Sequence, residues 1–444
     1  MNIIFSACGI SKKINKQAEK TILRDSSLVH AQTGICIFEP ATGKYWYRRQ
    51  DEKYFIPASN TKIFTCYAGM KYLGDSIIAA RVYPGNNSLV IDPAGDPSFL
   101  HPDFERQPLY NLLKAQGSGL IMADVITGFN DEPFGRGWAW DDYDSDYVQE
   151  KSKFPVYGNR VLFSNRLLYP RGSQHDSIVD TLVQVNGQPV SVKPKFFAAS
   201  VGSSYPEKGH HRSKNRNLFL LEVPLKKNTI VNLPFITDNG NTALQILANE
   251  LKRTVNSTTL FPGYSPAKPP RVVYSQHTDS LLKPMMHRSD NFFAEQVLLM
   301  AAREHIGYME TAAIIDTLLK TDLAGIPQQP RWVDGSGLSR YNLFTPQSIV
   351  WVLNKMYREY SFNRIKEIFA TGGEGTLSNY YQPLAGNIFA KTGTLSNHCA
   401  LSGYLITRKG KLLIFSVLTS SYPGSATPVR RAVERFLTGI YERY

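Results

Sequence analysis

The sequence predicts an α+β protein, with an antiparallel sheet flanked by helices and a long β-rich middle region. Two β-like runs, 399–406 and 411–418, are separated by the turn Arg408-Lys409-Gly410, which is typical of a β meander. Residues 86–274 contain several short apolar or alternating runs between Gly, Pro and Asn turns. With 444 residues, the chain is long enough for two or three domains.

The two ends of the chain are expected to pack on one sheet. A helical pattern at 12–29 precedes two strand-like runs, 32–39 and 44–48. Near the other end, Thr427-Pro428 opens a helix with an apolar stripe. Together with the meander, these segments predict a discontinuous domain.

A candidate nucleophile lies at the start of a predicted helix. Ser59-Asn60-Thr61-Lys62 follows Pro57-Ala58, and the helical pattern continues to 73, where Gly74 provides a stop. Ser59 and Lys62 are one turn apart, so their side chains share a face. A buried amine has a lowered pKa and can accept the hydroxyl proton near neutral pH.

A second motif, Ser289-Asp290-Asn291, precedes an apolar helical run. Alone, this tripeptide would most often be a helix N-cap. Beside a nucleophile, Ser289 can relay a proton from Lys62 to a leaving amine. The Asn291 amide can hydrogen-bond a substrate carbonyl or Lys62.

The third motif, Lys391-Thr392-Gly393-Thr394, stands where the pattern becomes extended. Lys391 and Thr392 can attract and hydrogen-bond a carboxylate, and Gly393 lets a ligand approach the backbone. The backbone N–H groups of Ser59 and Thr394 would form an oxyanion hole. Lysine on an edge strand also commonly protects against aggregation. The Lys-Thr-Gly motif therefore indicates an active site only in combination with the Ser59 and Ser289 motifs.

Chance alone would produce about one or two Ser-x-x-Lys matches in a chain of this length, but only about a tenth of a Lys-Thr-Gly. One decoy, Ser280-Leu281-Leu282-Lys283, lacks the preceding turn that marks Ser59. The order and spacing of the three motifs therefore select Ser59, Ser289 and Lys391.

These motifs resemble a known family of cell-wall enzymes. The stretches 57–62, 289–295, 334–340, 375–377 and 390–394 are similar to the D-alanyl-D-alanine carboxypeptidase/endopeptidase family typified by penicillin-binding protein 4. The resemblance implies a β-lactamase/transpeptidase-like domain with a large insertion between the first two motifs. The expected division is an N-terminal tether, a discontinuous catalytic domain and the inserted domain or domains, at 1–20, 21–85 plus 275–444, and 86–274 respectively.

The resemblance also implies a reaction. Ser59 would attack the carbonyl between two D-alanines of a peptidoglycan stem peptide, form an acyl-enzyme and then be released by water. The same residues serve a carboxypeptidase and an endopeptidase, so the choice between the two stays open. β-Lactams are expected to acylate Ser59 as covalent inhibitors. Neither a cofactor nor a metal is expected.

Two positions bear on substrate contacts. The family places an acid from the insertion near the substrate, where it recognises an amino-bearing side chain. Asp124, ahead of Trp138-Ala139-Trp140-Asp141-Asp142, is the candidate, and the alternative is a strand-end aspartate that caps a turn. Asn379 stands where family members often carry an arginine, which puts one peripheral contact in doubt.

Composition limits the partners and location. The net charge of +13 comes from dispersed basic residues without a nucleic-acid motif, so no nucleic acid is expected. Cys8, in Phe5-Ser6-Ala7-Cys8-Gly9, resembles the end of a lipoprotein signal, but the apolar run before it is too short for export. Either the true start lies upstream and a lipidated Cys8 anchors the protein to a membrane, or Cys8 is a chance cysteine. A periplasmic or cell-envelope location follows from the implied function alone.

Three rival functions remain open. A β-lactamase would need a dedicated deacylating base, and neither Glu-x-x-Leu-Asn nor Tyr-x-Asn is found in the expected place. A related esterase would usually carry tyrosine where Ser289 stands. A catalytically silent wall-binding protein would tolerate loss of Ser59, Lys62, Ser289 or Lys391, and all four are present.

Overall fold

The computed structural model describes residues 3–84, 87–117, 119–165, 181–204, 207–259 and 269–444. Its central sheet has six strands in the order β15-β16-β17-β18-β1-β2, all paired antiparallel. The strands are Ala370–Thr371, Ile388–Leu395, His398–Ile406, Leu412–Ser420, Gln32–Glu39 and Lys44–Arg49. The predicted meander is therefore confirmed, and the two strands predicted near the N-terminal end belong to the same sheet.

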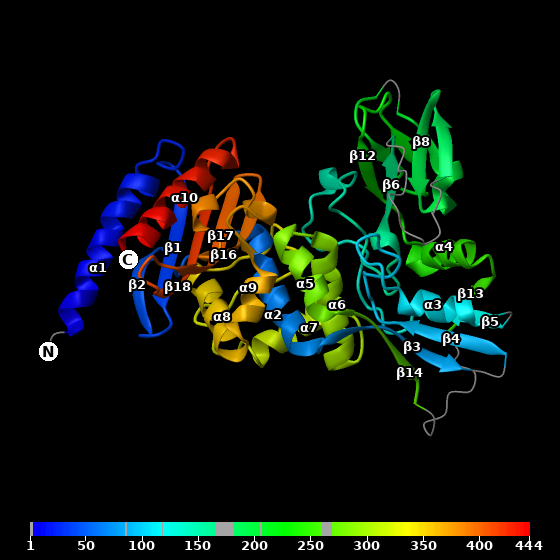
Figure 1. The fold of residues 1–444 in the computed structure, drawn as a ribbon, viewed down its shortest axis with the longest axis horizontal. Helices are drawn as coiled ribbons and strands as arrows, with labels where there is room; N and C mark the ends of the chain where they lie inside the picture. Colours follow the sequence, from blue (N-terminus) through cyan, green and yellow to red (C-terminus); the bar gives the residue numbers. More distant parts are fainter. Residues whose placement is uncertain (1–2, 85–86, 118, 166–180, 205–206, 260–268) are drawn as a thin grey trace.

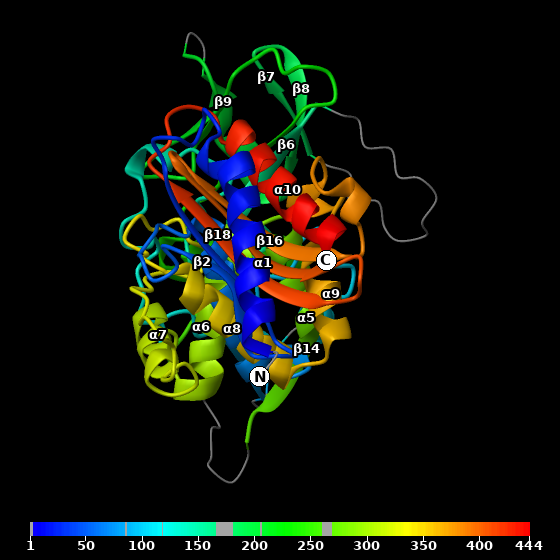
Figure 2. The same cartoon turned by 90° about the vertical axis from the view of Figure 1, so that its left-hand side faces the viewer.

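Two terminal helices lie side by side on one face of this sheet (Figure 2). They are α1 (Ile3–Ala18), which continues as a π-helical turn (Glu19–Leu23), and α10 (Ala426–Arg443). Ile14, Ala18 and Ile22 are fully buried in the core that these helices share with the sheet. The tether expected over 1–20 is thus corrected: its second half is helix packed on the sheet. Cys8 belongs to α1, and its side chain lies outside the described part.

A group of six helices covers the other face (Figure 1). They are α2 (Lys62–Tyr72), α5 (Thr278–His287), α6 (Asn291–Ile306), α7 (Thr311–Lys320), α8 (Pro346–Glu359) and α9 (Phe362–Ile368). The predicted helix at 61–73 is confirmed as α2, and its first nine residues are all buried. Gly69 lets α2 pack closely, because an added Cβ would lie 2.9 Å from Leu282 and 3.0 Å from Val297.

The middle of the chain forms a second body with its own core (Figure 1). A five-stranded sheet is ordered β13-β5-β4-β3-β14, and its strands are Val255–Ser257, Leu120–Ala123, Ser88–Pro93, Ser76–Pro84 and Arg271–His277. A four-stranded sheet is ordered β12-β6-β8-β7, and its strands are Ile230–Pro234, Arg160–Ser164, Gln188–Lys193 and Thr181–Val185. Three short strands and two helices complete this body: β10 (His211–Arg212), β11 (Phe219–Leu221), β9 (Val201–Ser203), α3 (Pro108–Ala115) and α4 (Asn241–Leu251). The β-rich middle region is therefore confirmed, and its two helices were not foreseen.

The chain enters and leaves this body through neighbouring strands. β3 pairs antiparallel with β14, from Arg271 opposite Val82 to His277 opposite Ser76. The limits expected at 85 and 275 stay a prediction. Because β3 belongs to the five-stranded sheet, we propose that the insertion begins near 76 and ends near 277.

Candidate active site

The turn that carries Ser59 is held in an unusual backbone shape. Ala58–Thr61 form one 3₁₀ turn immediately before α2, and Ala58 has a φ of 47°. Such a conformation is uncommon for a residue other than glycine and is frequent at functional sites. Gly337, with a φ of 85°, packs against this turn, and an added Cβ there would lie 1.9 Å from the Ala58 carbonyl oxygen. The surrounding chain therefore fixes the position of Ser59.

Lys62 is the centre of the site. Its Nζ donates hydrogen bonds to Ser59 Oγ at 3.1 Å, Asn291 Oδ1 at 2.7 Å and the Ser336 carbonyl oxygen at 2.6 Å. The side chain is completely buried, and burial lowers the pKa of Lys62 to about 8 against the opposing charges of nearby carboxylates. All three bonded acceptors are uncharged, so a neutral amine can form there and accept the Ser59 proton.

The second motif closes the site from α6. Asp290 is the N-cap of this helix and accepts a hydrogen bond from the Phe293 N–H at 3.0 Å. The cap leaves Ser289 in a left-handed conformation, with a φ of 62°. Asn291 bridges two parts of the molecule, because its Nδ2 donates to the Tyr147 carbonyl oxygen at 3.2 Å. The structural and functional interpretations of this tripeptide are therefore compatible.

The third motif lies on β16, opposite Ser59. Lys391 is fully buried, and its Nζ donates to Ser289 Oγ at 3.0 Å and to the Thr392 carbonyl oxygen at 2.8 Å. Burial, followed by the charges of Lys62 and Arg430, holds the pKa of Lys391 well below its usual range. The structure thus brings the three motifs together. Lys62 joins the first motif to the second through Asn291. Ser289 joins the second motif to the third through Lys391.

A close approach of backbones joins β16 to the Ser59 turn. Asn60 Nδ2 donates to the Lys391 carbonyl oxygen at 2.8 Å. An added Cβ at Gly393 would lie 2.6 Å from the Pro57 carbonyl oxygen and 3.1 Å from the Ser59 nitrogen. Glycine is required here because no side chain fits between the strand and the turn. The backbones of Ser59 and the Lys391–Thr394 strand are therefore adjacent.

Two buried carboxylates behind Lys62 had no assigned role in the sequence analysis. Glu295 accepts hydrogen bonds from the N–H groups of Gly335 at 3.1 Å and Ser336 at 2.7 Å. Burial, together with the negative charge of Asp334, raises the pKa of Glu295 to about 7. Asp334 accepts from the N–H groups of Gly337 and Ser339, at 2.9 and 2.6 Å. These bonds hold the loop whose Ser336 carbonyl faces Lys62.

The signal for these carboxylates was present in the sequence. Glu295 is the single charged residue in the buried part of α6, residues 292–302, and a buried charged residue needs a partner. Asp334 starts the Asp-Gly-Ser-Gly loop. What the sequence did not reveal was that the loop and the helix meet.

Asp124 contacts Lys153 and its own turn, not the residues of the three motifs. Its carboxylate is buried, lies 3.2 Å from Lys153 Nζ and accepts from the N–H groups of Ile126 and Thr127 at 3.1 and 2.8 Å. These contacts match the alternative of a strand-end aspartate that caps a turn. Asn379, the departure noted above, is exposed on a loop beside Tyr380.

A different acidic segment reaches the site. Trp138 Nε1 donates to Asp334 Oδ2 at 2.9 Å, and Tyr147 accepts from Asn291. Between them, Asp142 accepts a hydrogen bond from the Tyr147 hydroxyl at 2.9 Å. The part of the chain that the structure describes contains no group of three or more His, Cys, Asp and Glu residues placed to hold a metal.

The chain is similar to a known protein family and to several of its members. The sequence model of the D-Ala-D-Ala carboxypeptidase 3 (S13) family matches residues 15–440. The D-alanyl-D-alanine carboxypeptidase of Actinomadura sp. strain R39 is 26% identical over 456 residues, covering 91% of this chain and 80% of its own. D-alanyl-D-alanine carboxypeptidase DacB of Haemophilus influenzae is 25% identical over 406 residues, covering 83% and 81%. The crystal structure of penicillin binding protein 4 from H. influenzae superposes with a TM-score of 0.72 at 19% identity, over 97% of this chain and 99% of its own. A second structure of that protein, complexed with a β-lactam, gives a TM-score of 0.68 at 18% identity, over 97% and 99%.

Proposed function

The chain belongs to the D-Ala-D-Ala carboxypeptidase 3 (S13) family, and on that premise we propose that it cleaves peptidoglycan stem peptides through an acyl-enzyme on Ser59. Serine-type D-Ala-D-Ala carboxypeptidase activity is the function of this family. The proposal adds the residues that perform it here. The observation that carries it is the buried Lys62 amine, which is bonded to Ser59 Oγ and has a pKa of about 8.

The first half of the reaction makes an ester. Neutral Lys62 takes the Ser59 hydroxyl proton while Oγ attacks the carbonyl carbon between the two D-alanines. The negative charge that develops on the carbonyl oxygen is held by the N–H groups of Ser59 and Thr394. The carbon–nitrogen bond then breaks, and Ser289 passes the proton from Lys62 to the departing amine. D-Alanine leaves, and the rest of the peptide is esterified to Ser59.

The second half reverses these roles. Water attacks the ester carbonyl and gives a proton to the same relay, and Ser59 Oγ recovers a proton as the ester bond breaks. Lys391 and Thr392 are proposed to attract the terminal carboxylate, and Gly393 leaves room for the substrate backbone. A β-lactam would enter the same path, and its opened ring would stay attached to Ser59.

Muropeptide digestion tests the proposal. Purified muropeptides are incubated with wild type, Ser59→Ala and Ser280→Ala, and the products are identified by mass. Ser280 is the matched control, because it belongs to the exposed decoy Ser-x-x-Lys. Free D-alanine alone would indicate a carboxypeptidase, and monomers released from dimers an endopeptidase. Neither free D-alanine nor released monomers should form with Ser59→Ala, whereas Ser280→Ala should give the same products as wild type. The same products in all three samples would overturn the proposal.

Labelling with a fluorescent penicillin separates the rival functions. Slow, stable labelling of wild type supports the proposal, whereas rapid release of hydrolysed penicillin favours a β-lactamase. A catalytically silent wall-binding protein would bind muropeptides without acylation. Intact labelling of Ser59→Ala would show that another residue is the nucleophile.

We propose Asp142 ahead of Asp124 as the acid that recognises an amino group on the stem peptide. The segment that contains Asp142 contacts Asn291 through Tyr147, whereas Asp124 is committed to Lys153 and to its own turn. Asp142→Asn should raise KM for a peptide with a free side-chain amine and leave its acetylated form unaffected. If Asp124→Asn alone has this effect, the assignment returns to Asp124.

A cell-envelope location is proposed because the substrate lies there. Among the described residues, no helix has both the length and the apolar character needed to cross a membrane. The sequence Phe5-Ser6-Ala7-Cys8-Gly9 supports lipid attachment at Cys8. Metabolic labelling with a fatty-acid analogue should fail in Cys8→Ser if Cys8 is the site of attachment.

A further inference from the structure

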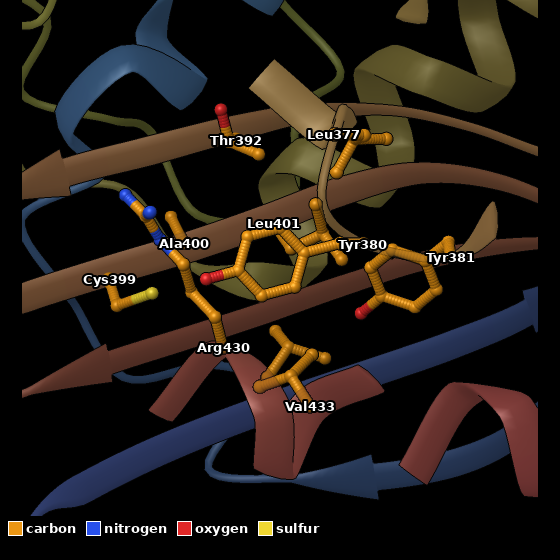
Figure 3. Close-up of a pocket in the computed structure, with 10 residues that line it drawn as sticks. Leu377, Tyr380, Tyr381, Thr392, Cys399, Ala400, Leu401, Arg430 and Val433 are labelled. Atoms are coloured by element: carbon orange, nitrogen blue, oxygen red, sulfur yellow. The ribbon is translucent and has the colours of Figure 1, made fainter. Parts of the chain in front are cut away.

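One arginine of helix α10, Arg430, contacts β16, the strand that contains the third motif. Arg430 Nη2 donates a hydrogen bond to Thr394 Oγ1 at 2.6 Å. Figure 3 shows the Arg430 side chain rising from α10 toward the sheet, with its guanidinium group nearest the strands. The side chain also lines a mostly apolar cavity with Leu401, Tyr380 and Val433. A permanent cation thus stands at the end of β16, beside a proposed oxyanion residue.

Arg430 has no carboxylate partner in the part of the chain that the structure describes. Among the described residues, no Asp or Glu forms an ion pair with it, whereas its neighbour Arg431 is paired with Glu434 at 2.5 Å. The guanidinium group has five N–H donors in a planar fork that matches a carboxylate. Thr394 uses an oxygen lone pair to accept from Arg430, so its own O–H can still donate to a ligand.

Lys391 is a poor candidate to hold a carboxylate alone. Its side chain is fully buried, and its Nζ is already bonded to Ser289 and to the Thr392 carbonyl oxygen. Arg430 is partly exposed and close enough for its charge to lower the pKa of Lys391. Arg430 is therefore open to solvent in part, whereas Lys391 is fully buried.

We propose that Arg430 and the Thr394 hydroxyl join Lys391 and Thr392 in binding the carboxylate of the leaving group, and that Arg430 makes the enzyme selective for substrates that carry one. This inference rests on the proposed function of Ser59. It assigns to α10 a specificity-determining residue that lies outside the three motifs. Arg430 takes no part in bond making, and its contact is with the departing half of the substrate.

The test uses two acyl-D-alanyl thioesters that differ only in the leaving group, mercaptoacetate or its primary amide. Arg430→Ala should lower kcat/KM for the mercaptoacetate thioester by about 10- to 100-fold, as expected for loss of a hydrogen-bonded charge pair. The amide thioester should change by less than about threefold, because it offers no carboxylate. Arg430→Lys should lie between wild type and Arg430→Ala, since lysine keeps the charge but loses the fork.

Arg431→Ala is the matched control. It removes the same charge from the neighbouring position of α10, where the arginine is already paired, and should leave both thioesters near wild type. An equal loss on both thioesters in Arg430→Ala would overturn the inference, because a merely structural contact with Thr394 would affect them alike. No loss on either would overturn it as well. Failure of the proposed function has a different signature: Ser59→Ala would then turn over both thioesters as wild type does.

Discussion

Two regions of this molecule bury a lysine, and they treat it in opposite ways. In the active site, Lys62 is surrounded by the uncharged acceptors of Ser59, Asn291 and Ser336. In the inserted region, Lys153 Nζ lies 2.8 Å from Asp92 Oδ1 and 3.2 Å from Asp124 Oδ2. Both side chains are essentially inaccessible to solvent.

The difference shows that burial alone does not make a catalytic base. Desolvation disfavours the charged amine, and the neutral neighbours of Lys62 leave that effect dominant. The carboxylates beside Lys153 instead form a buried ion cluster, whose members depend on one another. Lys62 is therefore expected to matter for reactivity, and Lys153 for stability.

The largest expected effect is on acylation. Lys62→Met removes the proton acceptor and should lower the rate of penicillin labelling about a thousandfold or more. The unfolding temperature should stay the same or rise, because an apolar side chain replaces a desolvated amine. Measured together, the two quantities distinguish a catalytic lysine from a structural one, and a large loss of stability would contradict the comparison.

Lys153→Met should have the opposite profile. Two buried carboxylates would lose a partner, which costs about 3–5 kcal/mol of unfolding free energy. Urea unfolding measures this loss, and penicillin labelling per folded molecule should be unchanged. Lys320→Met is the control, because the Lys320–Asp316 pair is exposed and should contribute less than about 1 kcal/mol.

The acylation rate of wild type should rise with pH and level off above about 8, the pKa of Lys62. Only the neutral amine accepts a proton, so the rate at two pH units below the midpoint should be about 100-fold below the plateau. The same group makes unfolding free energy rise with pH between about 8 and its ordinary value of 10.5, because the unfolded chain binds more protons there. Stopped-flow labelling from pH 6 to 9 would reveal the midpoint.

Glu295→Gln should have the smallest effect, about tenfold on kcat/KM. The amide keeps one acceptor oxygen, so one of the two N–H groups of Gly335 and Ser336 loses its partner. Loss of the negative charge should also move the acylation midpoint to lower pH, because Glu295 raises the pKa of Lys62. A midpoint that stays in place would show that Glu295 acts only on the loop.

Local patterns predicted much of the fold and of the site. Helix α2, the Asp290 cap and the strands of the meander each depend on neighbours in the chain, and the structure contains them. The roles of Glu295 and Asp334 were missed because they arise where two distant segments pack. The same reason explains Asp124, whose partner Lys153 comes from another loop.

The prediction of an N-terminal tether at 1–20 failed for a related reason. The polar run at 11–20 has only Ile14 and Ala18 as apolar positions on its buried side, a pattern too sparse to indicate a packed helix. Its burial depends on α10, which lies more than 400 residues further along the chain.

Because β1 pairs with β18, the central sheet cannot be completed until nearly the whole chain has been synthesised. Gln32 emerges early from the ribosome, yet its partner Ser420 is among the last residues made. Until β18 is made, no strand joins β17 to β1, so the part of the sheet that contains β16 cannot be linked to β1 and β2. Ser59 is thus synthesised long before the active site around it can assemble. An unfinished chain should therefore not react with penicillin.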